Sequence, residues 1–195
     1  MRTLDDAWNW YRAVGEGMKR LTHLAKFWGE FPWGQGDEWV ARVERDNVLR
    51  HVESVQMSTD AKSATDEHDD LAILVLFSVF EATVRAHLKE QLAPEISGLK
   101  HPSLVRAGKE VEEAVEHGSF GRLLHAFKLD ESEKNLIEQV SQVRVWRNWV
   151  AHGRRPQLRP VTEVRPRDAY ERLGEFLKLI RSFNATSGSP AGTQD

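Results

Sequence analysis

The stretch LAILVLFSVFEATVRAHLKEQL, residues 71–92, is the most hydrophobic segment of the chain. Its β-branched residues are compatible with a strand, but the segment far exceeds the ~10 residues of a long strand. Its apolar side chains also recur every three or four residues, which is the period of one helix face; these are Ile73, Phe77, Phe80, Val84 and Leu88. The segment therefore predicts a central helix around which other helices pack.

The sequence before this helix predicts two further helices. An apolar stripe runs from Leu4 to Trp28 at helical spacing, and FPWGQGD (31–37) ends it with Pro and Gly. A second, weaker helix is expected over 38–57, and the polar stretch 58–70 reads as a loop. The Trp-rich segment FWGEFPWGQGDEW (27–39) matches no motif, and its role stays open.

The sequence after the central helix predicts four more helices. The first two cover about 103–117 and 119–129, the third ends at about His152, and the last runs from Thr162 to Phe183. Pro94 and Gly98 are expected to end the central helix, and Gly153 is a natural residue to follow a helix end. The pattern predicts an all-α, up-and-down bundle of five to seven helices. We expect residues 1–60 to form a helical extension packed on the bundle, 61–184 the bundle, and 185–195 a disordered tail.

Composition narrows the class of protein. Hydrophobic residues make up 40% of the chain and charged residues 29%, which suits a folded domain with a real core. No apolar run approaches the ~20 residues of a bilayer span, and the N-terminus lacks the apolar region of a signal peptide. The chain has no cysteine, which excludes disulfides and cysteine-based chemistry. We expect a soluble, cytoplasmic protein without a membrane partner.

The stretch VRVWRNWVAHGRR (143–155) places charged groups where core side chains are expected. On a helical wheel, Arg144 and Arg147 fall on the stripe that Val140 and Val143 define, and Asn148 and His152 fall near its edge. Burying an unpaired guanidinium is costly, so these groups either face a cleft or have partners. Glu81 lies within the stripe of the central helix. The simplest hypothesis pairs Glu81 with Arg147 or Arg144, either beside a site or as a purely structural ion pair.

The residue types in this stretch favour phosphate chemistry. Asn148 and His152 are four residues apart and therefore neighbours on a helix surface. An imidazole titrates near neutrality and can transfer protons, and a nearby guanidinium can stabilise charge on a phosphate without a metal. Such a pair suits cleavage of RNA, where the ribose 2′-hydroxyl of the substrate is the nucleophile. DNA lacks this hydroxyl and is expected to resist.

Three segments resemble the HEPN-domain family over roughly residues 70–183. RNWVAHG (147–153) resembles its R-x(4–6)-H motif, FSVFEATVRAHL (77–88) its second core helix, and VRPRDAYERLGEFLKLI (164–180) its final helix. The resemblance implies a helical bundle, usually dimeric, with the two motifs meeting at the dimer interface. Many members of the family are metal-independent endoribonucleases of toxin or defence systems that leave a 2′,3′-cyclic phosphate.

Carried over to this chain, the resemblance implies a role for each motif residue. Arg147 stabilises the phosphate, His152 is the acid and base, and Asn148 orients the groups of the site. Glu81 and Arg144 are supporting polar residues. The resemblance implies that the protein needs no cofactor and no metal. It also implies three partners: RNA, a second copy of the chain and an antitoxin of the nucleotidyltransferase type. The alternatives are a non-catalytic HEPN module that binds nucleotide, RNA or protein, and a plain helical scaffold.

Basic residues concentrate around the same stretch. Residues 144–172 hold eight arginines and three acidic residues, a net charge of about +5, although the whole chain carries −3. Such a rim binds a phosphate backbone, which assigns substrate binding to Arg154, Arg155 and Arg159. The alternative is that these arginines are simply solvated.

Other signatures in the sequence are weak. Glu113 and His117 form one i,i+4 pair, which is more typical of a surface contact than of a metal site.

Overall fold

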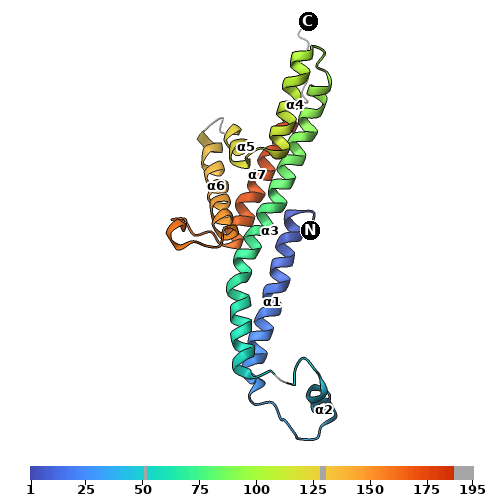
Figure 1. The fold of residues 1–195 in the computed structure, drawn as a ribbon, viewed down its shortest axis with the longest axis vertical. Helices are drawn as coiled ribbons and strands as arrows, with labels where there is room; N and C mark the ends of the chain where they lie inside the picture. The colour runs from blue at the N-terminus through green and yellow to red at the C-terminus, as the bar shows by residue number, and fades with distance from the viewer. Residues whose placement is uncertain (51, 128–130, 187–195) are drawn as a thin grey trace. The chain divides into compact units, whose positions relative to one another are not determined.

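The computed structural model describes residues 1–50, 52–127 and 131–186. All regular secondary structure in this part of the chain is helical, and turns and loops connect the helices (Figure 1). The prediction of an all-α fold is confirmed. The helices are α1 (Leu4–Trp28), α2 (Glu38–Arg45), α3 (Ser54–Ser97), α4 (Pro102–His117), α5 (Phe120–Ala126), α6 (Glu131–Ala151) and α7 (Pro166–Thr186), with a 3₁₀ turn η1 (Pro156–Leu158) before the last. Residues 185 and 186, predicted to begin a disordered tail, are the last residues of α7, and the rest of the predicted tail lies outside the described residues.

The chain divides into two compact units. The first, here called the bundle unit, comprises residues 1–8 and 72–195, and the second, the hairpin unit, comprises residues 9–71. Helices α1 and α3 each contribute residues to both units. Residues 1–60 are predicted to form an extension and residues 61–184 the bundle; residues 1–8 lie in the bundle unit, and residues 61–71 lie in the hairpin unit.

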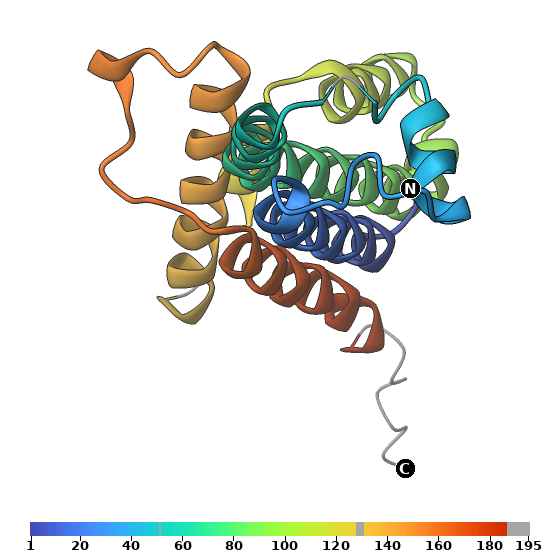
Figure 2. The ribbon, with the colours of Figure 1, turned by 90° about the horizontal axis from the view of Figure 1, so that it is seen from below.

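The core of the bundle unit is built around the predicted central helix, which forms the second half of α3. Phe77 and Phe80 of α3 contact Phe120 of α5 edge to face, with ring centroids 5.6 and 5.7 Å apart, and Phe80 meets Phe176 of α7 at 5.6 Å. Edge-to-face contacts suit the charge distribution of aromatic rings. Figures 1 and 2 show α6 and α7 packed beside this half of α3.

The first turns of α1 complete this core. Leu4 and Ala7 are buried, and the Trp8 ring stacks on the Tyr170 ring of α7 at 4.8 Å. The Tyr170 hydroxyl donates to Asp5 Oδ1 at 2.7 Å, and this hydrogen bond raises the pKa of Tyr170. The N-terminal residues are therefore part of the bundle because they cover apolar surface of α7.

The hairpin unit corrects two predictions. The polar stretch 58–70 is helical, because α3 begins at Ser54, and the predicted helix over 38–57 ends at Arg45. The physical reason is packing: Ala61 and His68 of the polar stretch are buried. His68 Nε2 lies 2.9 Å from the Tyr11 carbonyl oxygen, and its ring stacks on that of Tyr11 at 4.8 Å. A helix face that buries such contacts overrides low local hydrophobicity.

Tyr11 provides a test of this packing. Burial, then the hydrogen bond that its hydroxyl donates to Asp69 and the charge of that carboxylate, raise the pKa of Tyr11 to about 12. The folded state therefore holds the phenol proton more tightly than the unfolded chain, where tyrosine titrates near pH ~10. This stabilisation is complete below pH ~10 and is lost as the pH rises through about 12.

Because the chain has two tyrosines, the Tyr170→Phe variant leaves Tyr11 as the single reporter. We expect its tyrosinate absorbance to appear with a midpoint near pH 12, and Asp69→Asn to lower that midpoint. The same variant unfolded in urea serves as the control and should titrate near pH ~10. A folded-state midpoint at the unfolded value would contradict the packing of Tyr11.

Helix α3 also corrects the expectation that no segment reaches the length of a bilayer span. Among the described residues it is the one helix long and apolar enough, by length and composition, to cross a membrane. The core helix of a soluble bundle passes the same test. In this structure Leu76, Phe77, Phe80 and Val84 of α3 are buried in the bundle core.

Candidate functional site

The end of α6 is fixed by a Schellman motif. The Gly153 N–H donates to the Val150 carbonyl at 3.1 Å, and the Arg154 N–H donates to the Trp149 carbonyl at 3.0 Å. Gly153 has a φ of +81°, a conformation that glycine adopts without strain. The predicted helix end at Gly153 is confirmed. The motif fixes His152 directly after the last helical residue, with an exposed side chain.

Helix α6 changes from apolar to cationic on one side, as the wheel predicts. Val140 and Val143 are fully buried, whereas Arg144 and Arg147 are half-buried. Both guanidinium groups line a hollow of about 230 Å³, here called the arginine hollow, together with side chains of α3 and the residues around the turn between α4 and α5. The guanidinium of Arg147 is therefore not sealed in the interior.

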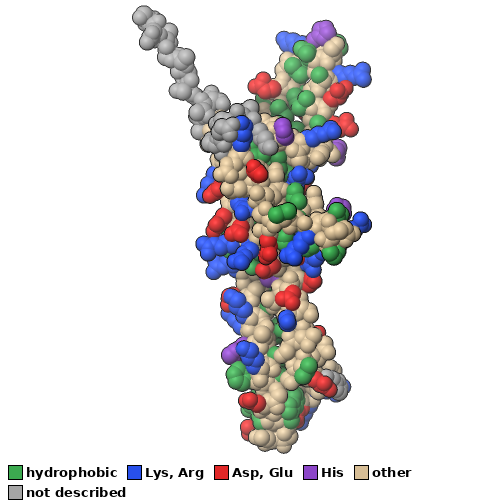
Figure 3. Space-filling view, turned by 90° about the vertical axis from the view of Figure 1, so that its left-hand side faces the viewer, with side chains coloured by type: hydrophobic (Ala, Val, Ile, Leu, Met, Phe, Trp, Pro, Cys, Tyr) green, Lys and Arg blue, Asp and Glu red, His purple; other side chains and the backbone are tan. Residues whose placement is uncertain are grey.

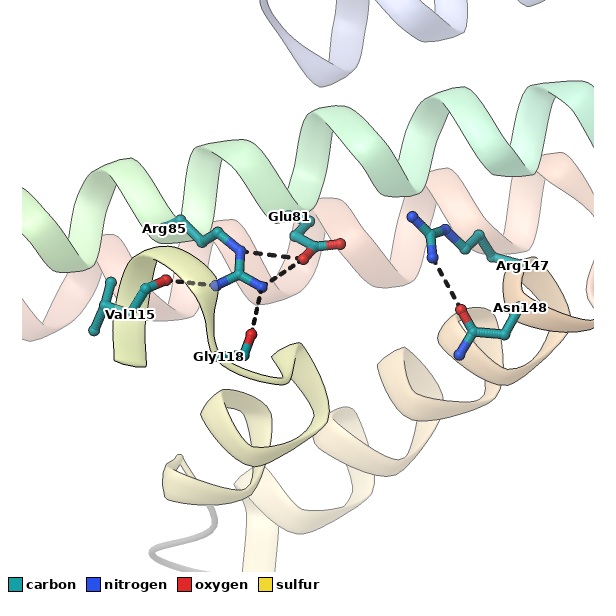
Figure 4. A network of polar contacts seen from close by, with 6 residues as sticks. All are labelled: Glu81, Arg85, Val115, Gly118, Arg147 and Asn148. Carbon is teal, nitrogen blue, oxygen red and sulfur yellow. Dashed lines mark hydrogen bonds and ion pairs between the residues drawn. The ribbon is translucent and has the colours of Figure 1, made fainter. Parts of the chain in front are cut away.

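Glu81 and Arg85 form one wall of the arginine hollow (Figure 4). Arg85 Nη2 lies 2.7 Å from Glu81 Oε1, and Arg85 also donates to the carbonyl oxygens of Val115 and Gly118. The hypothesis that Glu81 pairs with Arg144 or Arg147 is wrong. The i,i+4 spacing on α3 places Arg85 within direct reach of the carboxylate.

Arg144 and Arg147 are the cationic side chains of this hollow that do not pair with Glu81. Arg147 Nη1 donates to Asn148 Oδ1 at 3.0 Å (Figure 4), and its guanidinium carbon lies 5.5 Å from the centre of the Phe77 ring. The Nε atoms of Arg144 and Arg147 are buried without a hydrogen-bond partner. Among the described residues, no carboxylate lies within ion-pair distance of either guanidinium. Three guanidiniums and one carboxylate therefore face the hollow, a composition that favours an anion.

Gly121 sets the space around Arg144. A Cβ atom at this position would lie 3.2 Å from both Cζ and Nη1 of Arg144. We expect Gly121→Ala to displace the guanidinium and to weaken the binding of inorganic phosphate several-fold, measured as a dissociation constant. Gly17→Ala is the matched control, since a Cβ there meets nothing within 4 Å. Equal affinities in the two variants would show that the position of Arg144 is immaterial to binding.

A second hollow, here called the tryptophan pocket, shares a lining residue with the arginine hollow. It has a volume of about 380 Å³ and is lined by Val145, Asn148, Trp149, His152, Arg155 and Leu158. Asn148 lines both hollows. The structure thus brings together Glu81, Arg144, Arg147 and Asn148, and it places His152 in the adjoining pocket.

The three arginines predicted to bind substrate differ in their surroundings. Arg155 lines the tryptophan pocket. Arg159 forms an ion pair with Glu163 at 3.6 Å and lies over the rings of Trp146 and Trp149, at 5.9 and 5.8 Å from their centroids. Arg154 is half-buried and has a φ of +52°. In Figure 3, Lys and Arg side chains on the face shown have Asp and Glu side chains among them.

Sequence reasoning missed Arg85 and Gly121. The signal for Arg85 was present, because Glu81 and Arg85 are four residues apart in a segment predicted to be helical. Nothing in the sequence indicated that Gly121 lies against Arg144, since this contact depends on how α5 packs on α6.

Arg85 provides a test of the wall that it forms. Its side chain is 18% exposed, and its removal leaves the Glu81 carboxylate and two carbonyl groups without their donor. We expect Arg85→Met to lower the free energy of unfolding by about 3 kcal/mol in urea denaturation. Arg106→Met is the control, because the Arg106 side chain is 85% exposed and its ion pair with Glu110 is long, at 3.5 Å. A decrease no larger than that of the control would refute the structural role of Arg85.

Comparison of the chain with known protein families, curated proteins and solved structures gives no match. The class of protein is therefore defined by the fold and the site alone: an all-α protein with a cationic, partly open hollow at the end of one bundle helix.

Proposed function

We propose that the protein is a metal-independent endoribonuclease of toxin or antiphage type, with a HEPN-like arrangement, that acts in the cytoplasm. The observation that carries the proposal is the pair of guanidiniums, Arg144 and Arg147, which face a hollow without a carboxylate partner among the described residues. Asn148 joins this hollow to the pocket that holds the exposed imidazole of His152. These groups are those that RNA cleavage by its own 2′-hydroxyl requires.

The reaction follows from the chemistry of the groups. A phosphodiester of RNA binds with its non-bridging oxygens toward Arg147 and Arg144, whose N–H groups donate to it. An imidazole accepts the proton of the 2′-hydroxyl as its oxygen attacks phosphorus, and the guanidiniums stabilise the charge of the phosphorane. The bond to the 5′-oxygen breaks, this oxygen takes a proton, and a 2′,3′-cyclic phosphate remains. Asn148 is oriented by its hydrogen bond from Arg147.

The proposal includes a homodimer. Within one copy, His152 and Arg147 line different hollows. A second copy placed against the end of α6 would bring its own His152 imidazole to the arginine hollow, where that imidazole takes the proton of the 2′-hydroxyl and returns one to the 5′-oxygen. An antitoxin that covers this end of α6 would silence the enzyme.

The second candidate is a non-catalytic module that binds nucleotide, RNA or a partner protein through the same hollow. The observation that favours it is the separation of His152 from the arginine hollow within one copy. Binding requires the guanidiniums alone, whereas cleavage also requires an imidazole beside the phosphate.

The test is the incubation of the full-length protein, in EDTA, with a labelled RNA and with the same sequence as DNA. We expect the RNA to be cut with a 2′,3′-cyclic phosphate at the new end, and the DNA to stay intact. Binding of both strands without cleavage would favour the non-catalytic module. Equal cleavage of RNA and DNA would contradict a mechanism that uses the 2′-hydroxyl.

A further inference from the structure

The tryptophan pocket has a chemistry different from that of the arginine hollow. Val145, Leu158 and the Trp149 ring give it apolar walls, and Asn148, His152 and Arg155 place polar groups at it. Leu158 is 63% exposed and Val145 is 44% exposed, although both are apolar. Apolar walls with a few convergent polar groups are typical of a site for a small, flat, partly polar ligand group.

Contacts made by the residues that line the pocket, and by their neighbours, hold the pocket in place. The Trp149 Nε1–H donates to the Arg155 carbonyl at 2.9 Å, which ties the loop after α6 back to the helix. The Trp149 ring also packs against the Trp146 ring at 5.0 Å, and Trp146 is buried. The Schellman motif fixes the two residues that follow His152. The indole of Trp149 therefore uses its polar edge within the protein and offers apolar ring surface to the pocket.

The position of the pocket identifies the ligand group. It adjoins the arginine hollow across the single side chain of Asn148, which lines both. A nucleotide carries an anionic phosphate and a flat base that is apolar on its faces and polar at its edge, joined by one sugar. Nucleobases bind single-strand sites by contact with aromatic rings and by hydrogen bonds at their edges. The arginine hollow matches the phosphate, and the tryptophan pocket matches the base.

We propose that the tryptophan pocket binds a nucleobase of the strand whose phosphate occupies the arginine hollow. The proposal rests on the proposed function for the identity of the strand as RNA. The pocket then gives the protein a preference among bases at one position beside the bound phosphate. Asn148 and Arg155 are the groups that read the edge of the base.

The experiment is calorimetric titration of the full-length protein with the four nucleoside 5′-monophosphates and with ribose 5-phosphate, which lacks a base. We expect at least one nucleotide to bind about tenfold more tightly than ribose 5-phosphate. Leu158→Ser and Val145→Ser should each reduce this preference to less than threefold without changing the affinity for ribose 5-phosphate. Arg147→Gln should weaken both classes of ligand. Val161→Ser is the matched control, since Val161 is fully exposed and does not line the pocket.

The outcomes separate this proposal from the proposed function. Base-dependent binding that Leu158→Ser removes supports the pocket even if the protein cuts no RNA. Cleavage of RNA by a protein that binds ribose 5-phosphate as tightly as every nucleotide overturns the pocket and leaves the nuclease. If Leu158→Ser changes the oligomeric state in sedimentation and leaves nucleotide affinity unchanged, the occupant is a second copy and the proposal is wrong.

Discussion

Replacing His152 by alanine is expected to lower the rate of RNA cleavage about a thousandfold and to leave the free energy of unfolding within about 0.5 kcal/mol of the wild-type value. The first effect follows from the proposed mechanism, in which the His152 imidazole transfers the protons. The second follows from the exposure of the side chain, which lies beyond the last residue of α6. Initial rates on a labelled RNA and urea denaturation measure the two effects.

His117→Ala is the control for this result, because His117 is also an exposed histidine at the end of a helix. It should retain full activity. RNA affinity should fall little in the His152→Ala variant, since the guanidiniums that we propose bind the phosphate are unchanged. A His152→Ala enzyme that cuts RNA at the wild-type rate would remove His152 from the mechanism, even if RNA binding persisted.

Replacing Arg147 by alanine is expected to lower the cleavage rate about 100- to 1,000-fold, the effect of removing one preorganised donor to a developing charge. The fold should persist. Arg147 makes a hydrogen bond to its neighbour Asn148 and a contact with the Phe77 ring, and no carboxylate among the described residues depends on it for a partner. We expect a decrease of about 1 kcal/mol or less in the free energy of unfolding. Activity assays and urea denaturation of the same preparation provide both numbers.

Two further variants define the role of Arg147. Arg147→Lys keeps the charge but lacks the planar fork of donors, so its rate should fall between those of the wild type and the alanine variant. Arg122→Ala, an exposed arginine of α5 that does not line the hollow, should behave as the wild type. Unfolding of the Arg147→Ala protein under native conditions would mean that Arg147 is a structural residue, and the assignment of the site would fail.

The part of the fold that the sequence predicted well is the part where local pattern and packing agree. The stripe of residues 73–88 is apolar at helical spacing, and in the structure its members Ile73, Phe77, Phe80 and Val84 are buried. The prediction of a loop over 58–70 was wrong because the polar composition hides a single narrow buried face that includes Ala61 and His68. Pro94 and Gly98 were expected to end the central helix. The helix continues through Pro94, whose missing N–H removes a single bond close to the helix end, and it stops at Ser97, directly before Gly98.

The candidate site was predictable where it depends on one helix and was not where it depends on several. The wheel places Arg144 and Arg147 on the inward side of α6, and both line a hollow there. The pairing of Glu81 was wrong because a wheel gives directions and no distances between helices. The separation of His152 from the arginine hollow agrees with the same wheel, because His152 follows Arg147 by five residues and therefore points about 140° away from it around the helix axis.

The measurement that tests the central claim most directly is the salt dependence of binding to an uncleavable 2′-O-methyl RNA strand. Wild type is compared with the Arg144→Gln/Arg147→Gln double variant. If both guanidiniums hold phosphates, the slope of log affinity against log salt concentration should become shallower by about 1.4, which is roughly 0.7 for each phosphate of a single strand that the protein no longer neutralises. An unchanged slope in a folded double variant would show that the hollow at the end of α6 does not bind the RNA backbone.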